Sequence, residues 1–167
     1  IKAVYNYSLD CCDTKSRPGY KGTSAAALRF LGDWMNEYGQ SCSFPIHCEF
    51  LSGAGVALAP DSRICRALAQ GGVAVTRCLL SVGHYVLITG AEGGVAELWD
   101  PYHVEVPIRK RSIRMVTDQP YHCNRRVTFA QMNAEGKGYY SFGDIEKREC
   151  LLLFNTQASR GSIYAEV

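Results

Sequence analysis

The sequence lacks the features that mark several large classes of protein. It has no run of eighteen or more apolar residues, which excludes a bilayer-spanning helix. It also lacks a strong charge of either sign, because 18 Lys and Arg stand against 16 Asp and Glu, for a formal net charge of +2. These charges are scattered apart from the run Arg109, Lys110 and Arg111. We therefore expect neither nucleic acid nor an acidic membrane as a main partner.

The chain also lacks an initiating Met and any Pro- or Ser-rich linker. Because it begins with Ile1, we expect a trimmed or processed chain, and the localisation, cytoplasmic or exported, stays open. The 167 residues are 47% hydrophobic and contain no internal repeat or low-complexity tract. We expect one domain over residues 1–167, of unknown oligomeric state.

Eight cysteines are present, but none forms a C-x-x-C pair. Cys65, Cys78 and Cys150 lie in apolar runs, where free cysteine behaves as a small hydrophobic residue, so we expect most thiols to be reduced core residues. A zinc site is disfavoured because adjacent His–Cys pairs rarely ligate one ion together, and we expect no metal. The residues considered for such a site are Cys42, His47, Cys48, His122 and Cys123.

Helical patterns come first in the chain and strand patterns follow. Residues 23–39 predict a central helix that is capped by Thr23 or Ser24 and ends at Gly39. A shorter helix is predicted within residues 61–72, with Asp61 or Ser62 as its cap. Hairpin-length links favour a largely antiparallel sheet, and therefore an α+β fold. The predicted strands cover residues 73–80, 84–90, 95–100, 125–132 and 148–155.

Residues 83–102 predict a β-hairpin with a histidine at its entrance and an aspartate at its exit. A pairing that is symmetric about Glu92 places Ile88 opposite Ala96, Val86 opposite Leu98, and His84 opposite Asp100. Directly opposed Cβ atoms lie roughly 4.5–5.5 Å apart, which is close enough for a hydrogen bond between His84 and Asp100. A bulge or a two-residue turn would shift this register and spoil the pairing. The same register makes Trp99 face Tyr85.

A carboxylate beside an imidazole fixes the tautomer of the ring and stabilises its protonated form. A general base, or the counter-ion of a thiolate, needs that arrangement. The structural alternative is that His84 is a half-buried strand residue, while Asp100, ahead of Pro101, caps a turn. The hairpin alone leaves both interpretations open.

Residues 66–102 resemble a known family of enzymes. The run LAQGGVAVTRCLLSVGHYVLITGAEGGVAELWDPY is similar to the histidine and aspartate region of papain-like cysteine peptidases related to the bacterial, bacteriocin leader-processing (double-glycine) peptidases. Gly83, His84, Tyr85 and Val86 open a strand, and the pair 100–101, Asp-Pro, closes the next. GTSAAALRFLG resembles the central helix of that family, and RECLLLFN resembles its closing strand. The resemblance implies a papain-like fold, with the central helix packed on an antiparallel sheet.

In this family the nucleophilic cysteine opens the central helix, six residues after a Gln that helps to form the oxyanion hole. The resemblance implies Cys12 as the nucleophile, with Asn6 in the place of the Gln. Cys11 is the alternative nucleophile, because many relatives have an acidic residue before the cysteine, as Asp10 is here. Aligning the helices instead places Lys21 where the cysteine belongs, and Lys21 cannot replace a thiolate. In that case the chain is a catalytically inactive domain that binds peptides or regulates another protein.

The resemblance implies hydrolysis of peptide bonds in a peptide or protein substrate. The thiolate attacks the carbonyl carbon, His84 transfers the proton, Asp100 orients His84, and Asn6 with a backbone N–H holds the oxyanion. No metal or organic cofactor is required. The same residues serve a thiol-dependent acyltransferase in which an amine replaces water.

Two further segments have an ordinary and a functional interpretation. Residues 133–144 are rich in Gly and aromatic residues, and we expect an ordinary connection rather than a loop that lines a peptide groove. Residues 103–115 contain a cluster of cations, and we expect an exposed edge strand guarded by charge rather than a site for an acidic partner.

Overall fold

The computed structural model describes residues 7–17, 19–102, 104, 108–118 and 122–157. Its seven described strands form one sheet in the order β1-β7-β2-β3-β4-β6-β5, and each neighbouring pair is antiparallel. The predicted α+β class with an antiparallel sheet is therefore confirmed. The strands are β1 Ile46–Ser52, β2 Val73–Leu80, β3 Val82–Glu92, β4 Val95–Trp99, β5 Ile113–Met115, β6 Arg125–Thr128 and β7 Glu149–Asn155.

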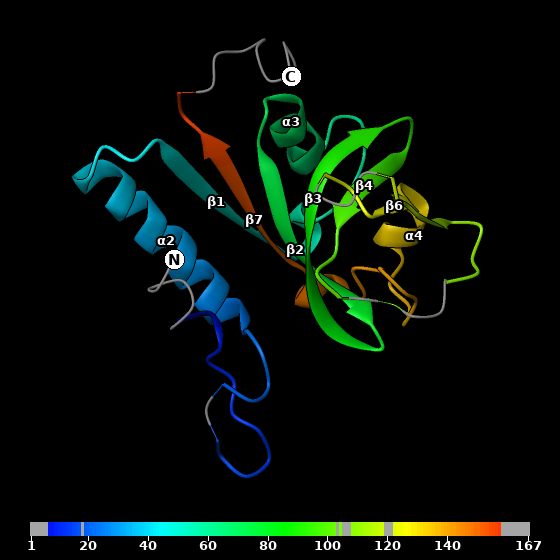
Figure 1. Cartoon of the computed structure of the whole chain (residues 1–167), viewed down its shortest axis with the longest axis horizontal. Helices are drawn as coiled ribbons and strands as arrows, with labels where there is room; N and C mark the ends of the chain where they lie inside the picture. The colour runs from blue at the N-terminus through cyan, green and yellow to red at the C-terminus, as the bar shows by residue number, and fades with distance from the viewer. Residues whose placement is uncertain (1–6, 18, 103, 105–107, 119–121, 158–167) are drawn as a thin grey trace.

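Helix α2, Ala25–Ser41, lies alongside β1 and packs on the sheet (Figure 1). It begins after Ser24, one of the two predicted caps, whose hydroxyl accepts a hydrogen bond from the Ala27 N–H. A Cβ atom on Gly32 would lie 2.6 Å from a methyl group of the buried Leu151, so a larger residue here would force the Leu151 side chain to shift. The helix continues two residues beyond the predicted end at Gly39.

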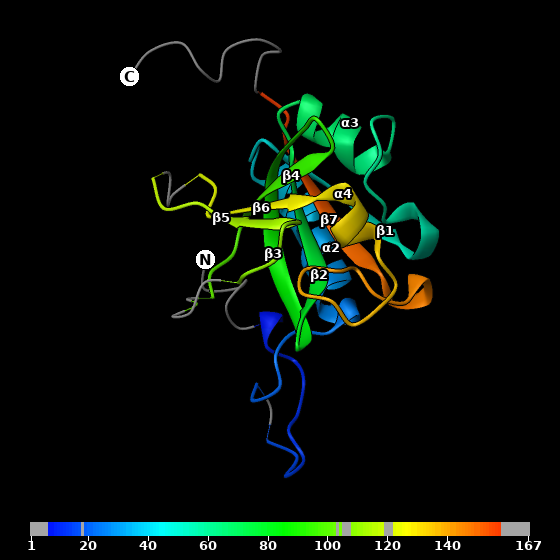
Figure 2. The same cartoon turned by 90° about the vertical axis from the view of Figure 1, so that its right-hand side faces the viewer.

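The other helices cover the remaining parts of the sheet. Helix α3, Arg63–Ala69, begins after Ser62, which accepts from the Cys65 N–H as predicted. Helix α4, Phe129–Asn133, lies beside β6 (Figure 2). Two short 3₁₀ helices also lie in the described part of the chain, η1 at Gly53–Gly55 and η2 at Ile145–Lys147. No helix in the described part of the chain combines the length and the apolar character that crossing a membrane requires.

The predicted strand over residues 125–132 is half wrong. Its first half is β6, but Thr128 then accepts a hydrogen bond from the Gln131 N–H and caps α4. Strand β1 was not predicted. The predicted edge strand in residues 103–115 is confirmed for β5, which lies at the end of the sheet order, whereas residues 103 and 105–107 lie outside the described residues.

The packed core lies on both faces of the sheet. On one face, Val86 and Ile88 of β3 pack in a cluster with Ile64 and Ala67 of α3. On the other face, residues of α2, β1 and β7 form a smaller cluster, against which Tyr85 of β3 packs. This division follows from the alternation of side chains along a strand, and it decides which groups can meet at the site described next.

Candidate active site

His84 and Asp100 are in contact. His84 Nε2 lies 2.7 Å from Asp100 Oδ1, and the Asp100 side chain is fully buried while that of His84 is 22% exposed. The predicted hydrogen bond is confirmed. Because Nε2 is engaged by the carboxylate, Nδ1 is the ring nitrogen that remains for proton transfer in the neutral tautomer.

The register that produces this contact differs from the predicted one. Gly93 and Gly94, with φ of 57° and 77°, make a two-residue turn, and Glu92 pairs with Val95. That turn alone would place Asp100 on the opposite face of the hairpin from His84.

A β-bulge restores the shared face. Ile88 pairs with Leu98 and Gly90 pairs with Glu97, so that Thr89 is the extra residue on β3. His84 and Asp100 are therefore on one face but two positions out of direct opposition. The predicted pairs of Ile88 with Ala96 and Val86 with Leu98 are wrong, and Leu87, not Tyr85, lies opposite Trp99.

The Asp100 carboxylate accepts two hydrogen bonds besides the one from His84. The Tyr102 N–H donates to Oδ1 over 2.8 Å, and the Tyr140 hydroxyl donates to Oδ2 over 2.7 Å. Burial raises the pKa of Asp100, but the hydrogen bonds that its carboxylate accepts outweigh burial, so its pKa lies below the ordinary value. The carboxylate is thus ionised near neutral pH and presents a negative charge to His84.

The backbone of Asp100 is fixed by Asn124. The Asn124 side chain accepts from the Asp100 N–H and donates to the Asp100 carbonyl, each over 2.8 Å. The next residue, Arg125, is buried and donates through Nε to the Tyr140 hydroxyl over 3.0 Å. Arg125 also donates to the carbonyls of Asn124 and Tyr102. These contacts hold both the main chain and the side chain of Asp100 in one position.

Tyr140 supports Asp100 from a distant part of the sequence. It is fully buried, has a φ of 60°, and donates its N–H to the Leu79 carbonyl of β2 over 2.7 Å. A bulky residue rarely adopts a left-handed conformation, and such strain gathers at functional sites. Sequence reasoning missed this residue because no local pattern links residue 140 to residue 100.

The two candidate nucleophiles lie in a loop that folds back on the start of α2. The Cys12 side chain is exposed, and Cys11 donates from Sγ to Asp10 Oδ1 over 3.7 Å. Asp10 also accepts from both the N–H and the hydroxyl of Ser24, which anchors the loop at the helix cap. Burial and the negative charge of Asp10 raise the pKa of Cys11, which disfavours its thiolate. Asn6 lies outside the described residues.

Helix α2 and His84 lie on opposite faces of β3. His84 shares a face with Val86, whereas Tyr85 points to the other face and packs against the cluster that includes Leu28 of α2. Among residues 7–17 and 19–102, no hydrogen bond joins either candidate thiol to His84. A thiol that precedes α2 therefore has to pass around the end of β3 to reach the imidazole.

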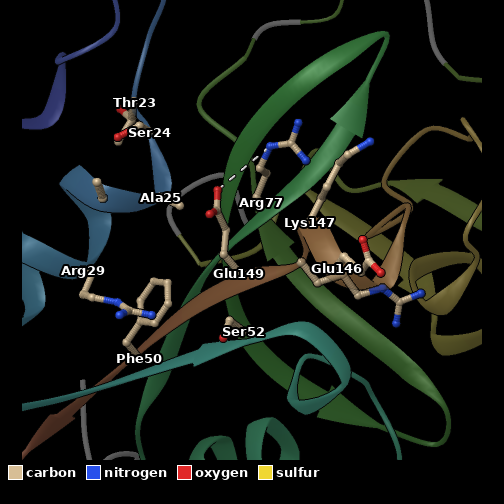
Figure 3. Close-up of a pocket in the computed structure, with 12 residues that line it drawn as sticks. Thr23, Ser24, Ala25, Arg29, Phe50, Ser52, Arg77, Glu146, Lys147 and Glu149 are labelled. Carbon is tan, nitrogen blue, oxygen red and sulfur yellow. Dashed lines mark ion pairs between the residues drawn. The ribbon is translucent and has the colours of Figure 1, made fainter.

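The end of β3 around which such a thiol has to pass is the end that carries Tyr85. The hydroxyl of Tyr85 donates to the buried Glu149, which lines the same pocket as Ser24. Because Asp10 accepts from Ser24, the loop lies at the end of β3 that carries Tyr85 and His84. Figure 3 shows Ser24 at the start of α2, across a pocket of about 530 Å³ from the ion pair of Arg77 with Glu149, whose Nε–Oε1 distance is 4.0 Å.

A different thiol lies next to His84. Cys78 of β2 pairs directly with His84 in the sheet, but it is fully buried, and burial raises its pKa. A buried thiol with a raised pKa is a poor nucleophile at neutral pH. Cys78 is therefore a core residue, as its apolar run predicts.

The five residues considered for zinc are far apart in the fold. His47 and Cys48 belong to β1, whereas Cys123 precedes β6, and four strands lie between β1 and β6. Within the described ranges no group of three or more His, Cys, Asp or Glu side chains is placed to hold a metal ion.

A groove of about 700 Å³ opens beside His84. The ring of Tyr102 contacts that of His84 edge-on, with centroids 6.2 Å apart. Tyr139, from the connection over residues 133–144, also lines this groove. The site thus consists of a buried, oriented carboxylate, a partly exposed imidazole and an adjacent groove.

Comparison with known proteins identifies no family for this chain. A scan against protein-family models finds no match, and a search of curated proteins finds no relative. What the fold and the site define is an α+β protein with a histidine–aspartate pair at the end of an antiparallel sheet.

Proposed function

We propose that this chain is a papain-like cysteine peptidase domain, in which Cys12 is the nucleophile, His84 is the base and Asp100 orients His84. The observation that carries the proposal is the Asp100 carboxylate, which is buried, ionised and hydrogen-bonded to an imidazole that borders a groove. Desolvating a carboxylate beside a histidine costs free energy, and such pairs are concentrated at catalytic sites.

Cys12 is the better of the two candidate thiols. It is exposed, whereas Cys11 donates to Asp10 and has a raised pKa. The loop that carries Cys12 lies at the same end of β3 as His84. In the proposed reaction this loop moves around the strand end, so that Cys12 reaches His84 in part of the free molecules, and substrate binding favours that closed state.

The chemistry balances without a cofactor. His84 Nδ1 takes the proton of the Cys12 thiol, and the thiolate forms a bond to the carbonyl carbon of the substrate. The C–N bond then breaks, and the protonated His84 gives its proton to the leaving amine. Water then attacks the resulting thioester while its proton passes to His84. The C–S bond breaks, the acid product leaves, and His84 returns the proton to the Cys12 sulfur. An amine in place of water gives acyl transfer.

The test is cleavage of a peptide library, followed by mass spectrometry. We expect products from the wild type, none from Cys12→Ser or His84→Ala, and retained activity in Cys11→Ser, which is the matched control. An added amine acceptor that appears in the products would identify acyl transfer. Absence of cleavage by the wild type, or cleavage that survives Cys12→Ser, contradicts the proposal.

A catalytically silent peptide-binding domain is the second candidate. The placement of α2 and His84 on opposite faces of β3 favours it, because no described thiol outside the core lies beside the imidazole. In that case the groove binds peptides, and neither Cys12→Ser nor His84→Ala changes any product, because none forms.

A further inference from the structure

The groove beside His84 has a largely apolar surface. Three large hydrophobic residues that line it are open to solvent, with Val82 70%, Tyr102 58% and Tyr139 48% exposed. Exposed apolar side chains that gather in one concave place mark a binding surface. One requirement for an occupant is therefore an apolar side chain.

The first residues of β3, beside this surface, have no described partner strand on the side of β4. Strand β4 pairs with β3 only from Leu87 to Glu92, whereas β2 pairs with β3 as far as Val82. Residues 82–86 therefore have β2 on one side and none of the described strands on the other. An extended peptide recognises such an edge, because its main-chain groups form hydrogen bonds to the unpaired strand.

The far side of the groove is cationic. Arg109 and Lys110 line it, and neither takes part in an ion pair within the described part of the chain. The described residues that line the groove include no Asp or Glu. Two cations that have no acid among the described lining residues favour an occupant that brings a carboxylate.

We propose that the groove binds an extended peptide, which places an aliphatic or aromatic side chain against Val82, Tyr102 and Tyr139 and an acidic side chain on Arg109 and Lys110. The inference deepens the proposed function, because it names the substrate class of the same site. Cleavage of the bound peptide depends on the proposed function. Binding of the peptide does not, because it requires no thiol.

The experiment measures binding by fluorescence anisotropy in the Cys12→Ser variant, so that cleavage cannot remove the probe. The probes are labelled peptides with one Leu and one Glu at varied spacing, each with a twin that has Gln in place of Glu. For at least one spacing we expect about fivefold tighter binding of the Glu peptide, the size of a surface ion pair, and a weaker preference at high salt.

The groove cations are tested by Arg109→Gln with Lys110→Gln. We expect this double variant to bind the Glu and Gln peptides equally. The matched control, Arg66→Gln with Arg114→Gln, removes the same charge at two exposed positions outside the groove and should keep the preference. Failure of every peptide to bind, equal binding of the twins, or a preference that survives loss of both groove cations overturns the inference.

The wild type separates this inference from the proposed function. Glu-dependent binding without cleavage would leave the inference standing and remove the peptidase. Cleavage with no preference for Glu would support the peptidase and overturn the inference about the groove.

Discussion

The Tyr140 hydroxyl donates a 2.7 Å hydrogen bond to Asp100 Oδ2, from a backbone held at a φ of 60°. The hydroxyl also accepts from Arg125 Nε, so a buried cation and a buried carboxylate are joined through one phenol. The orientation of His84 depends on this connection, because the same carboxylate holds the imidazole.

Tyr140→Phe removes the hydroxyl and retains the ring. We expect the free energy of unfolding to fall by about 1–3 kcal/mol, because Asp100 and Arg125 each lose a buried partner. We also expect the pKa of Asp100 to rise toward its ordinary value, which carbon NMR of the carboxyl group measures. Tyr139→Phe is the control, since Tyr139 is 48% exposed and should change neither quantity. An unchanged Asp100 pKa in Tyr140→Phe would contradict this role.

Stability should fall in acid because of Asp100. Its pKa is lower in the folded than in the unfolded state, so its contribution is complete above the unfolded value of about 3.9 and is lost as the pH falls through the folded value. Asp100→Asn should flatten this part of the profile in urea unfolding between pH 2 and pH 7. Equal acid slopes for the variant and the wild type would show that Asp100 is not the group concerned.

Asn124→Ala should displace the backbone of Asp100 without removing a hydrogen bond from its carboxylate. The substitution leaves the buried N–H and carbonyl of Asp100 unpaired, for a loss of about 2 kcal/mol in the free energy of unfolding. Asn155→Ala is a matched control, because among the described residues the Asn155 side chain accepts only from an exposed backbone N–H at residue 157. Similar losses in the two variants would mean that the Asn124 side chain does not fix Asp100.

The thiols should divide into protected and reactive groups. Burial raises the pKa of Cys48 to about 11 and that of Cys150 to about 12. We expect both to resist iodoacetamide at pH 8 until denaturant is added, whereas the exposed Cys42 reacts in the folded protein. Reaction of Cys150 at the rate of Cys42 without denaturant would show that the core is open.

The sequence predicts those parts of the fold that local patterns decide. Ser24 and Ser62 are caps because a short hydroxyl precedes an apolar helical stripe, and both predictions are confirmed. The face shared by His84 and Asp100 was predicted for an incorrect reason, because a two-residue turn and a bulge at Thr89 offset each other. A bulge depends on tertiary contacts, and Thr89 donates to the distant carbonyl of His122.

The contacts within the site are harder to predict from the sequence than the hairpin is. Tyr140 and Asn124 reach Asp100 through the folded chain, and no spacing in the sequence signals either contact. The position of Cys12 relative to His84 likewise depends on which face of the sheet α2 covers. Apolar periodicity shows that a helix packs on a sheet, but not on which face.

The most direct test of the central claim is the rate of iodoacetamide reaction at Cys12 between pH 5 and pH 9, with the exposed Cys42 as an internal standard. In the wild type we expect Cys12 to react faster than Cys42 below pH 7, because His84 stabilises its thiolate. His84→Ala should remove that advantage, and Asp100→Asn should reduce it. Equal rates for Cys12 and Cys42 at every pH, whatever residue occupies position 84, would contradict a working pair of Cys12 and His84.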